Sequence, residues 1–287
     1  MPTSVSTKLR IPKTLKFFIN GKFVRTESGR SFPCYCHQTE NLYAHLSRAS
    51  RKDLRNAVEA AKTAQLAWSG RAAFNRSQIL YRAAEMLEGK RREFAEVFRE
   101  TLGYEEPQAH SAVDAGIEAF IYYAGFADKY AQILGAVNPV SGPHHNFTTP
   151  EAVGVVGLIA SETFNFGNLV AQISAVLCSG NTLVVLLHGE SAWGLGPLAE
   201  VFATCDLPAG VVNLLTGDLD ELAPQLGSHM EIEALAYAGG DATVFGKLKV
   251  LGVPNMKRMI GPMKEPHSLE NIASFTEFKT VWHPVGC

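Results

Sequence analysis

The stretch from Val153 to Ala160 reads V-G-V-V-G-L-I-A, an apolar run with the length and β-branched content of a buried strand. Three more short apolar runs follow it, separated by helical patterns, at Thr182–Leu187, Val211–Leu215 and Ala234–Tyr237. Strands that alternate with helices predict a parallel sheet covered on both faces, and right-handed crossovers make such a sheet doubly wound. The expected fold is therefore α/β of Rossmann type, which is an architecture that often binds nucleotides.

The residues before these strands predict a hairpin and then helices. The segment Phe17–Phe23 reads F-F-I-N-G-K-F, in which Asn20-Gly21 is a strong signal for a two-residue hairpin turn. Ser50 followed by Asp53 has the spacing of a capping box and predicts the start of an amphipathic helix. Two longer helical patterns follow, over residues 76–102 and 111–134.

Composition excludes several classes of protein. Hydrophobic residues make up 46% of the 287 residues and charged residues 19%, which permits a large buried core and argues against intrinsic disorder. The net charge of −2 argues against nucleic-acid binding, because the one basic run, Gly89–Arg92, lies among glutamates in a helical pattern. No apolar run reaches the roughly 18 residues that a membrane-spanning helix needs. We therefore expect neither a nucleic-acid partner nor a membrane.

The cysteines do not form the pattern of a disulfide framework or of a metal site. Their number is odd and their positions are scattered: Cys34, Cys36, Cys178, Cys205 and Cys287. No secretory signal precedes the first helical pattern, so we expect a reducing, cytoplasmic location. Cys34, Cys36 and His37 are too closely spaced on one extended segment to close a zinc site, and no metal is expected.

Several motifs together resemble the cofactor domain of the aldehyde dehydrogenase family. They are G-V-V-G-L-I from Gly154, S-G-N-T from Ser179, L-P-A-G-V-V-N from Leu207, T-G-D from Thr216, and a tail, S-F-T-E-F-K-T-V-W, from Ser274. The resemblance implies that the tail is an oligomerisation strand that pairs with another chain. It also implies three parts: an arm over residues 1–16, a cofactor-type domain over residues 17–255, and a linker with the tail strand over residues 256–287.

In that family a second domain carrying a nucleophilic cysteine and a general-base glutamate precedes the tail. Here the resemblance to the cofactor domain ends near Leu251, and the tail begins within about 25 residues. That span is too short for a domain. No segment resembles the family's cysteine or glutamate motifs. Cys178 and Cys205 lie where small core residues would serve, so the resemblance implies no catalytic residue in this chain.

The resemblance also marks the positions that would contact the cofactor, and the residues there differ from the family pattern. Thr163 stands where the family has an asparagine that stabilises an oxyanion; a two-residue shift of the alignment would instead place Asn165 there. Leu186 and Gly189 stand where a lysine and a glutamate contact the adenosine ribose, and Glu190 comes one place late.

The family's turn under the pyrophosphate corresponds to Gly239 and Gly240, followed by Asp241. Glycines allow close approach of a phosphate, whereas Asp241 would cap the helix itself and repel an anion. Together these substitutions predict degenerate cofactor positions and no bound cofactor.

The function implied is that of a pseudoenzyme: a non-catalytic partner of a full-length aldehyde dehydrogenase subunit, needed because open strand edges and apolar surfaces require cover. Two alternatives remain open. The chain is an NAD(P)-binding subunit of an active aldehyde dehydrogenase complex, or it is a scaffold that associates with itself.

Overall fold

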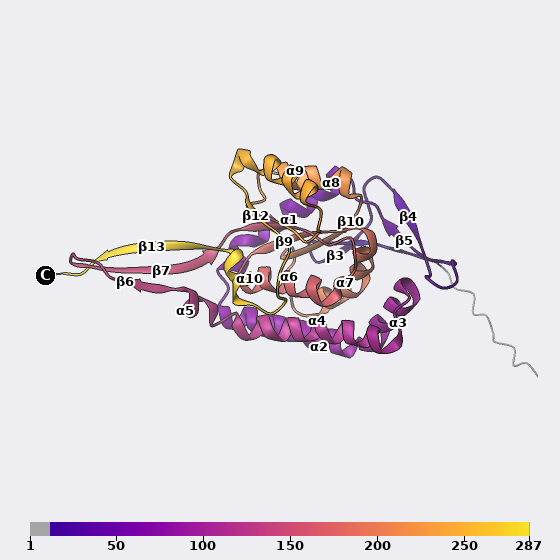
Figure 1. The fold of residues 1–287 in the computed structure, drawn as a ribbon, viewed down its shortest axis with the longest axis horizontal. Helices are drawn as coiled ribbons and strands as arrows, with labels where there is room; N and C mark the ends of the chain where they lie inside the picture. Colours follow the sequence, from indigo (N-terminus) through magenta and orange to yellow (C-terminus); the bar gives the residue numbers. More distant parts are fainter. Residues whose placement is uncertain (1–11, 287) are drawn as a thin grey trace, which may run out of the picture.

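The computed structural model describes residues 12–286, and its centre is a seven-stranded sheet between layers of helices (Figure 1). The strand order is β12-β11-β8-β9-β10-β2-β3, and the strands from β12 to β10 are parallel. Their bounds are β8 Val155–Ile159, β9 Thr182–Leu187, β10 Val212–Thr216, β11 Ala234–Tyr237 and β12 Arg258–Ile260, followed by the hairpin β2 Phe17–Ile19 and β3 Lys22–Val24. This is the Rossmann-type, doubly wound fold that the alternation of strands and helices predicts.

Both faces of the sheet are covered, because buried apolar side chains of β8, β9, β10 and β11 lie on each of them. Leu158 and Val185 face a core shared with one layer of helices, whereas Ile159 and Val184 face the core on the other side. Each fully buried side chain of this size contributes about 1.5–3 kcal/mol. The alternation therefore requires a helical layer on each side.

Helices on one face are α1 Arg51–Ser69, α8 Leu219–Ser228 and α9 Ala242–Gly252; the short helix η2, Val253–Asn255, follows α9 (Figure 1). The other face carries α6 Phe166–Cys178 and α7 Leu195–Thr204, with the short helix η1 Gly189–Gly194 before α7. Beneath α6 lies an outer layer formed by α2 Ala73–Gly89, α3 Arg91–Leu102 and α4 Glu106–Phe126, with α5 Tyr130–Leu134 at its end (Figure 1). Among residues 12–286 no helix is long and apolar enough to cross a membrane.

The local signals of the N-terminal half are confirmed. Asn20 and Gly21 form the hairpin turn with positive φ angles of 52° and 70°. Ser50 and Asp53 form the complete capping box at the start of α1. A small sheet, which the sequence did not predict, joins β1 Lys13–Leu15, β5 Leu42–Ser47 and β4 Ser31–Tyr35.

Two strands lie just outside the limits expected for the cofactor-type domain, residues 17–255. Residues 13–15 of the predicted arm form β1, while residues 1–11 lie outside the described part of the chain. Strand β12 reaches Ile260 and belongs to the central sheet, so the sheet continues beyond residue 255.

A three-stranded antiparallel ribbon projects from the body (Figure 1). Its strands are β6 Ala136–Asn138, β7 His144–Ala152 and β13 Thr276–Pro284. The tail was expected to pair with another chain, but β13 pairs with β7 of its own chain, from Thr276 opposite Ala152 to Pro284 opposite His144. The outer edge of β13 has no partner strand within the described residues.

Between β12 and β13 the chain crosses the body as residues 261–275, here called the strap, which include α10 Leu269–Ser274. The hydroxyl of Tyr123 on α4 donates a hydrogen bond of 2.7 Å to the carbonyl of Pro266, and Asn271 donates one of 2.9 Å to the same hydroxyl. Ile272 and Phe275 are buried in the core. The strap is therefore fixed against the α6 side of the body.

Candidate functional site

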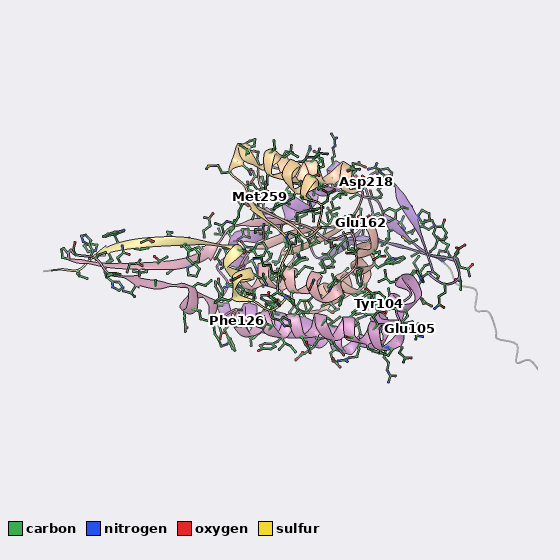
Figure 2. The ribbon with its side chains drawn as sticks, in the orientation of Figure 1. Tyr104, Glu105, Phe126, Glu162, Asp218 and Met259 are labelled. Carbon is green, nitrogen blue, oxygen red and sulfur yellow. The ribbon has the colours of Figure 1, made fainter. Side chains whose placement is uncertain are left out.

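The strand order reverses between β8 and β11, and this point is the candidate site. The chain runs from β8 to β9 and β10 on one side, then returns to place β11 on the other side of β8. In doubly wound sheets ligands bind at the carboxyl ends of the strands where the order reverses. Glu162 follows β8, and Figure 2 shows it at the end of the sheet remote from the ribbon.

A cavity of about 190 Å³ opens at these strand ends and is called the outer cavity. Thr163 lines it, and its hydroxyl lies 3.1 Å from the hydroxyl of Ser161. Asn165 lines it too, but its side chain caps α6 by accepting a hydrogen bond of 2.9 Å from the N–H of Asn168. The structure thus brings both sequence candidates for the oxyanion position to one cavity.

The loops after β8 and β9 are joined by hydrogen bonds. The N–H of Glu190 donates to the carbonyl of Glu162 at 2.9 Å, and the carboxylate of Glu190 accepts from the N–H of Phe164 at 3.2 Å. The buried ring of His188 lies 2.8 Å from the carbonyl of Ala160, and burial lowers the pKa of His188. These contacts hold the rim of the outer cavity in one arrangement.

Neither of the two positions expected to contact a ribose presents a side chain that could do so. Leu186 is 1% exposed and belongs to the core on the α1 side of the sheet. Gly189 has a φ of 54°, and a Cβ there would lie 2.7 Å from Cγ of Glu162. Leu186 is buried and a side chain at position 189 would clash with Glu162, so side-chain contacts to a ribose must come from other residues.

The start of α9 combines open space with a negative charge. Asp241 is its N-cap, accepting hydrogen bonds from the N–H groups of Thr243 at 2.7 Å and Val244 at 3.3 Å, which lower the pKa of Asp241. A Cβ on Gly239 would meet the ring of Tyr237, whereas a Cβ on Gly240 would meet nothing within 4 Å. The self-capping predicted for Asp241 is confirmed, and Gly240 leaves room for a ligand.

A second cavity, of about 360 Å³, lies under the strap and is called the inner cavity. Gln172, Pro262 and Met263 line both cavities, so the two adjoin. The side chain of Gln172 is 7% exposed and makes no hydrogen bond within residues 12–286. The sequence contains no signal for this residue, because a glutamine within an apolar helix resembles any core-facing polar residue until its partners are known.

Three of the four described cysteines are poor candidates for a nucleophile because burial raises the pKa of their thiols. Cys178 and Cys205 are fully buried, and burial raises the pKa of each thiol to about 12. Burial also raises the pKa of Cys34 to about 11. None of these thiols lines the outer or the inner cavity. Cys287 lies outside the described residues, and residues 12–286 contain no group of three or more metal-ligating side chains.

A comparison with protein families decides the relationship. The model of the aldehyde dehydrogenase family matches residues 23–260. The chain belongs to the aldehyde dehydrogenase family. It is similar to aldehyde dehydrogenase family 2 member B4 of Arabidopsis thaliana, with 31% identity over 83% of this chain and 44% of that protein. Human retinal dehydrogenase 2 is 32% identical over 86% of this chain and 48% of that protein.

Solved structures of aldehyde dehydrogenases share the fold. An NAD⁺ complex of aldehyde dehydrogenase from Bacillus cereus superimposes with a TM-score of 0.79 at 28% identity, over 86% of this chain and 50% of that protein. A complex of PnpE with nicotinamide adenine dinucleotide gives 0.81 at 26% identity, over the same shares of the two chains. This chain thus spans about half the length of its relatives.

These complexes overturn one expectation from the sequence. The substitutions at Leu186, Gly189 and Asp241 predicted a chain without a cofactor, and that prediction is wrong. Family members with this fold bind NAD in solved structures, so the fold is an NAD(P)-binding one. A doubly wound sheet offers a nucleotide a crevice at the point where the strand order reverses, and substitutions at single positions do not remove that crevice.

Proposed function

We propose that this chain is a dinucleotide-binding subunit of the aldehyde dehydrogenase family that does not oxidise aldehydes by itself. It acts beside a complete aldehyde dehydrogenase subunit. The observation that carries this proposal is the strap: residues 261–275 alone connect the last strand of the cofactor-type sheet to the ribbon. A segment of that length, fixed by Tyr123, has no room for a catalytic domain.

The residues at the crevice fit a dinucleotide. Gly240 leaves open space at the start of α9, where the remaining backbone N–H groups favour a phosphate. The hydroxyls of Ser161 and Thr163 are polar groups at the mouth of the outer cavity, and Gln172 offers an unpaired amide inside it. A nicotinamide dinucleotide supplies a hydride acceptor when bound. The chain's own part is to hold and orient it.

The positions of the described cysteines support the non-catalytic half of the proposal, because none of them lines the outer or the inner cavity. Aldehyde oxidation by this family's route begins with attack of a thiolate on the carbonyl carbon. A thiol with a pKa of about 12, such as Cys178 or Cys205, is almost entirely protonated at neutral pH. Both also lie in the core, where an aldehyde has no access.

The ribbon supports the proposal of a protein partner. Phe278 and Trp282 are 51% and 60% exposed, and the two-residue period of a strand puts them on one face of β13. An open strand edge beside exposed aromatic residues is suited to pairing with another chain. We infer that a full-length aldehyde dehydrogenase is the partner; association with a second copy of this chain is the other possible outcome of the test.

Three measurements on the full chain test the proposal. Calorimetry with NAD⁺ and NADP⁺ should show binding, and assays with aliphatic and aromatic aldehydes should show no NADH formation. Affinity purification should retrieve a full-length aldehyde dehydrogenase. Lack of binding to either dinucleotide would overturn the proposal, as would aldehyde turnover that a single cysteine substitution abolishes. A homo-oligomer that retrieves no such enzyme would replace the partner with a second copy of this chain.

A further inference from the structure

Gln172 is a buried polar side chain without a partner, and it lies where two cavities meet. It projects from α6, its side chain is 7% exposed, and it makes no hydrogen bond with any described residue. Its amide atoms are not among the enclosed polar atoms that lack a partner, so the amide is open to the two cavities that Gln172 lines. A ligand that fills these cavities can therefore form hydrogen bonds with both the donors and the acceptor of the amide.

Three other polar side chains around these cavities have partners within the fold. Asn271 donates to the Tyr123 hydroxyl and to the Glu265 carbonyl, at 2.9 and 2.8 Å. The Ser274 hydroxyl donates to the Glu270 carbonyl at 2.8 Å. On the side of the outer cavity, Ser191 donates to the His188 carbonyl at 2.7 Å. Gln172 differs from these three side chains in that its amide has no partner within the fold.

Gln172 lies where the nicotinamide half of a bound dinucleotide is expected. In Rossmann-type sheets the adenosine half lies over the second strand of the unit, which here is β9, and the other half lies across the reversal point. The outer and inner cavities lie on that other side, beside β11 and β12, and share Gln172 with Pro262 and Met263 of the strap. The inner cavity, at about 360 Å³, has the size of a small ligand pocket.

We propose that Gln172 selects the carboxamide of the nicotinamide ring and that Pro262 and Met263 of the strap cover that ring. The inference rests on the proposed dinucleotide binding. A primary amide carries an acceptor and two donors, so it pairs with a second primary amide through two parallel hydrogen bonds. A carboxylate offers acceptors only, and one of its oxygens would face the Gln172 carbonyl. The residue therefore favours the carboxamide over the carboxylate.

Three ligands and three variants of the full chain test this selection by calorimetry. The ligands are NAD⁺, its nicotinic acid analogue, in which a carboxylate replaces the carboxamide, and ADP-ribose, which lacks the ring. The wild type should bind NAD⁺ about tenfold more tightly than the acid analogue. Gln172→Met, which keeps the volume, should remove that preference and leave ADP-ribose affinity within about twofold. Gln172→Lys should reverse the preference.

Gln78→Leu is the matched control, because Gln78 is exposed on α2 and lines neither cavity. It should leave all three affinities unchanged, and thermal denaturation should confirm that each variant is folded. If all three ligands bind and Gln172→Met leaves the ratio of NAD⁺ to acid-analogue affinity unchanged, the role of Gln172 is overturned while dinucleotide binding stands. If none of the ligands binds the wild type, the proposed function itself is overturned.

Discussion

The side chain of Asn181 donates a hydrogen bond of 2.8 Å to the carbonyl of Phe275, and its oxygen accepts one of 2.8 Å from the N–H of Gly154. Asn181 is fully buried, and its two partners stand at the start of β13 and at the junction of β7 and β8. One amide therefore fixes both strands of the ribbon to the body.

We expect Asn181→Ala to lower the free energy of unfolding by about 2–5 kcal/mol, because it leaves two buried backbone groups unpaired. Urea denaturation measures the change. Asn75→Ala is the control, since Asn75 is exposed and bonds only to Gln78, and it should change stability by less than about 0.5 kcal/mol. Equal effects of the two substitutions would contradict this role of Asn181.

Replacing Asp241 by Asn should strengthen NAD⁺ binding about two- to fivefold. Asn caps a helix as well as Asp does, so α9 stays intact while the negative charge at its start is removed. The gain should shrink at high salt, because exposed charges are screened. Asp218→Asn is the matched control: Asp218 caps α8 at the end of β10, two strands from β8, and its replacement should not change affinity. A gain of equal size in both variants would show that the effect is not local.

The double substitution of Phe278 and Trp282 by Ser should abolish association with the partner and leave the body folded. Both side chains are exposed, and burial of apolar surface contributes about 25 cal/mol per Å². Light scattering and affinity purification measure the assembly. Lys279→Ser on the opposite face of β13 is the control. Unchanged assembly in the double variant would move the interface away from the ribbon.

Cys178 and Cys205 should resist alkylation by iodoacetamide at pH 8 in the folded protein. Burial raises the pKa of each thiol to about 12 and removes access to reagent. Mass spectrometry of the digested protein should find both modified only after denaturation. Rapid modification of either residue in the native chain would show that it is accessible, and would weaken the case against a nucleophile.

Lys257 should make stability depend on pH in the alkaline range. Its ammonium donates to the carbonyls of His229 and Ile232, it faces Glu233, and burial lowers its pKa from 10.5 to about 8. Between these values the unfolded chain holds more protons than the folded one, so stability gains up to about 1.4 kcal/mol per pH unit as pH rises. In Lys257→Met, the free energy of unfolding should not show this rise with pH. A stability difference between the two proteins that is constant from pH 8 to 10 would contradict the lowered pKa.

The sequence predicted the strands and turns well, because their signals are local. The runs Thr182–Leu187 and Ala234–Tyr237 are β9 and β11 to the residue, and the Asn20-Gly21 turn and the capping box at Ser50 depend on neighbours in the chain. The small sheet of β1, β4 and β5 was missed because its pairing joins short, partly exposed segments.

The site was less predictable, because its residues act through neighbours that are distant in the sequence. Gly189 is a ribose position by counting, yet its backbone is against Glu162. Glu190 comes one place late by counting, and its exposed carboxylate accepts a hydrogen bond from the N–H of Phe164 in the neighbouring loop. Gln172 is a candidate for ligand binding only because the strap folds over α6 and lines the inner cavity together with it.

The ribbon is covalently continuous with a strand that forms the crevice. Its middle strand, β7, leads through Val153 and Gly154 directly into β8. The side chain of Asn181 accepts a hydrogen bond from the N–H of Gly154 at this connection. The nine paired positions of β13 and β7 join the segment around Trp282 to the strand that ends at the candidate site. A subunit that bound the tip of the ribbon would therefore contact β7, which continues directly into β8 at the crevice.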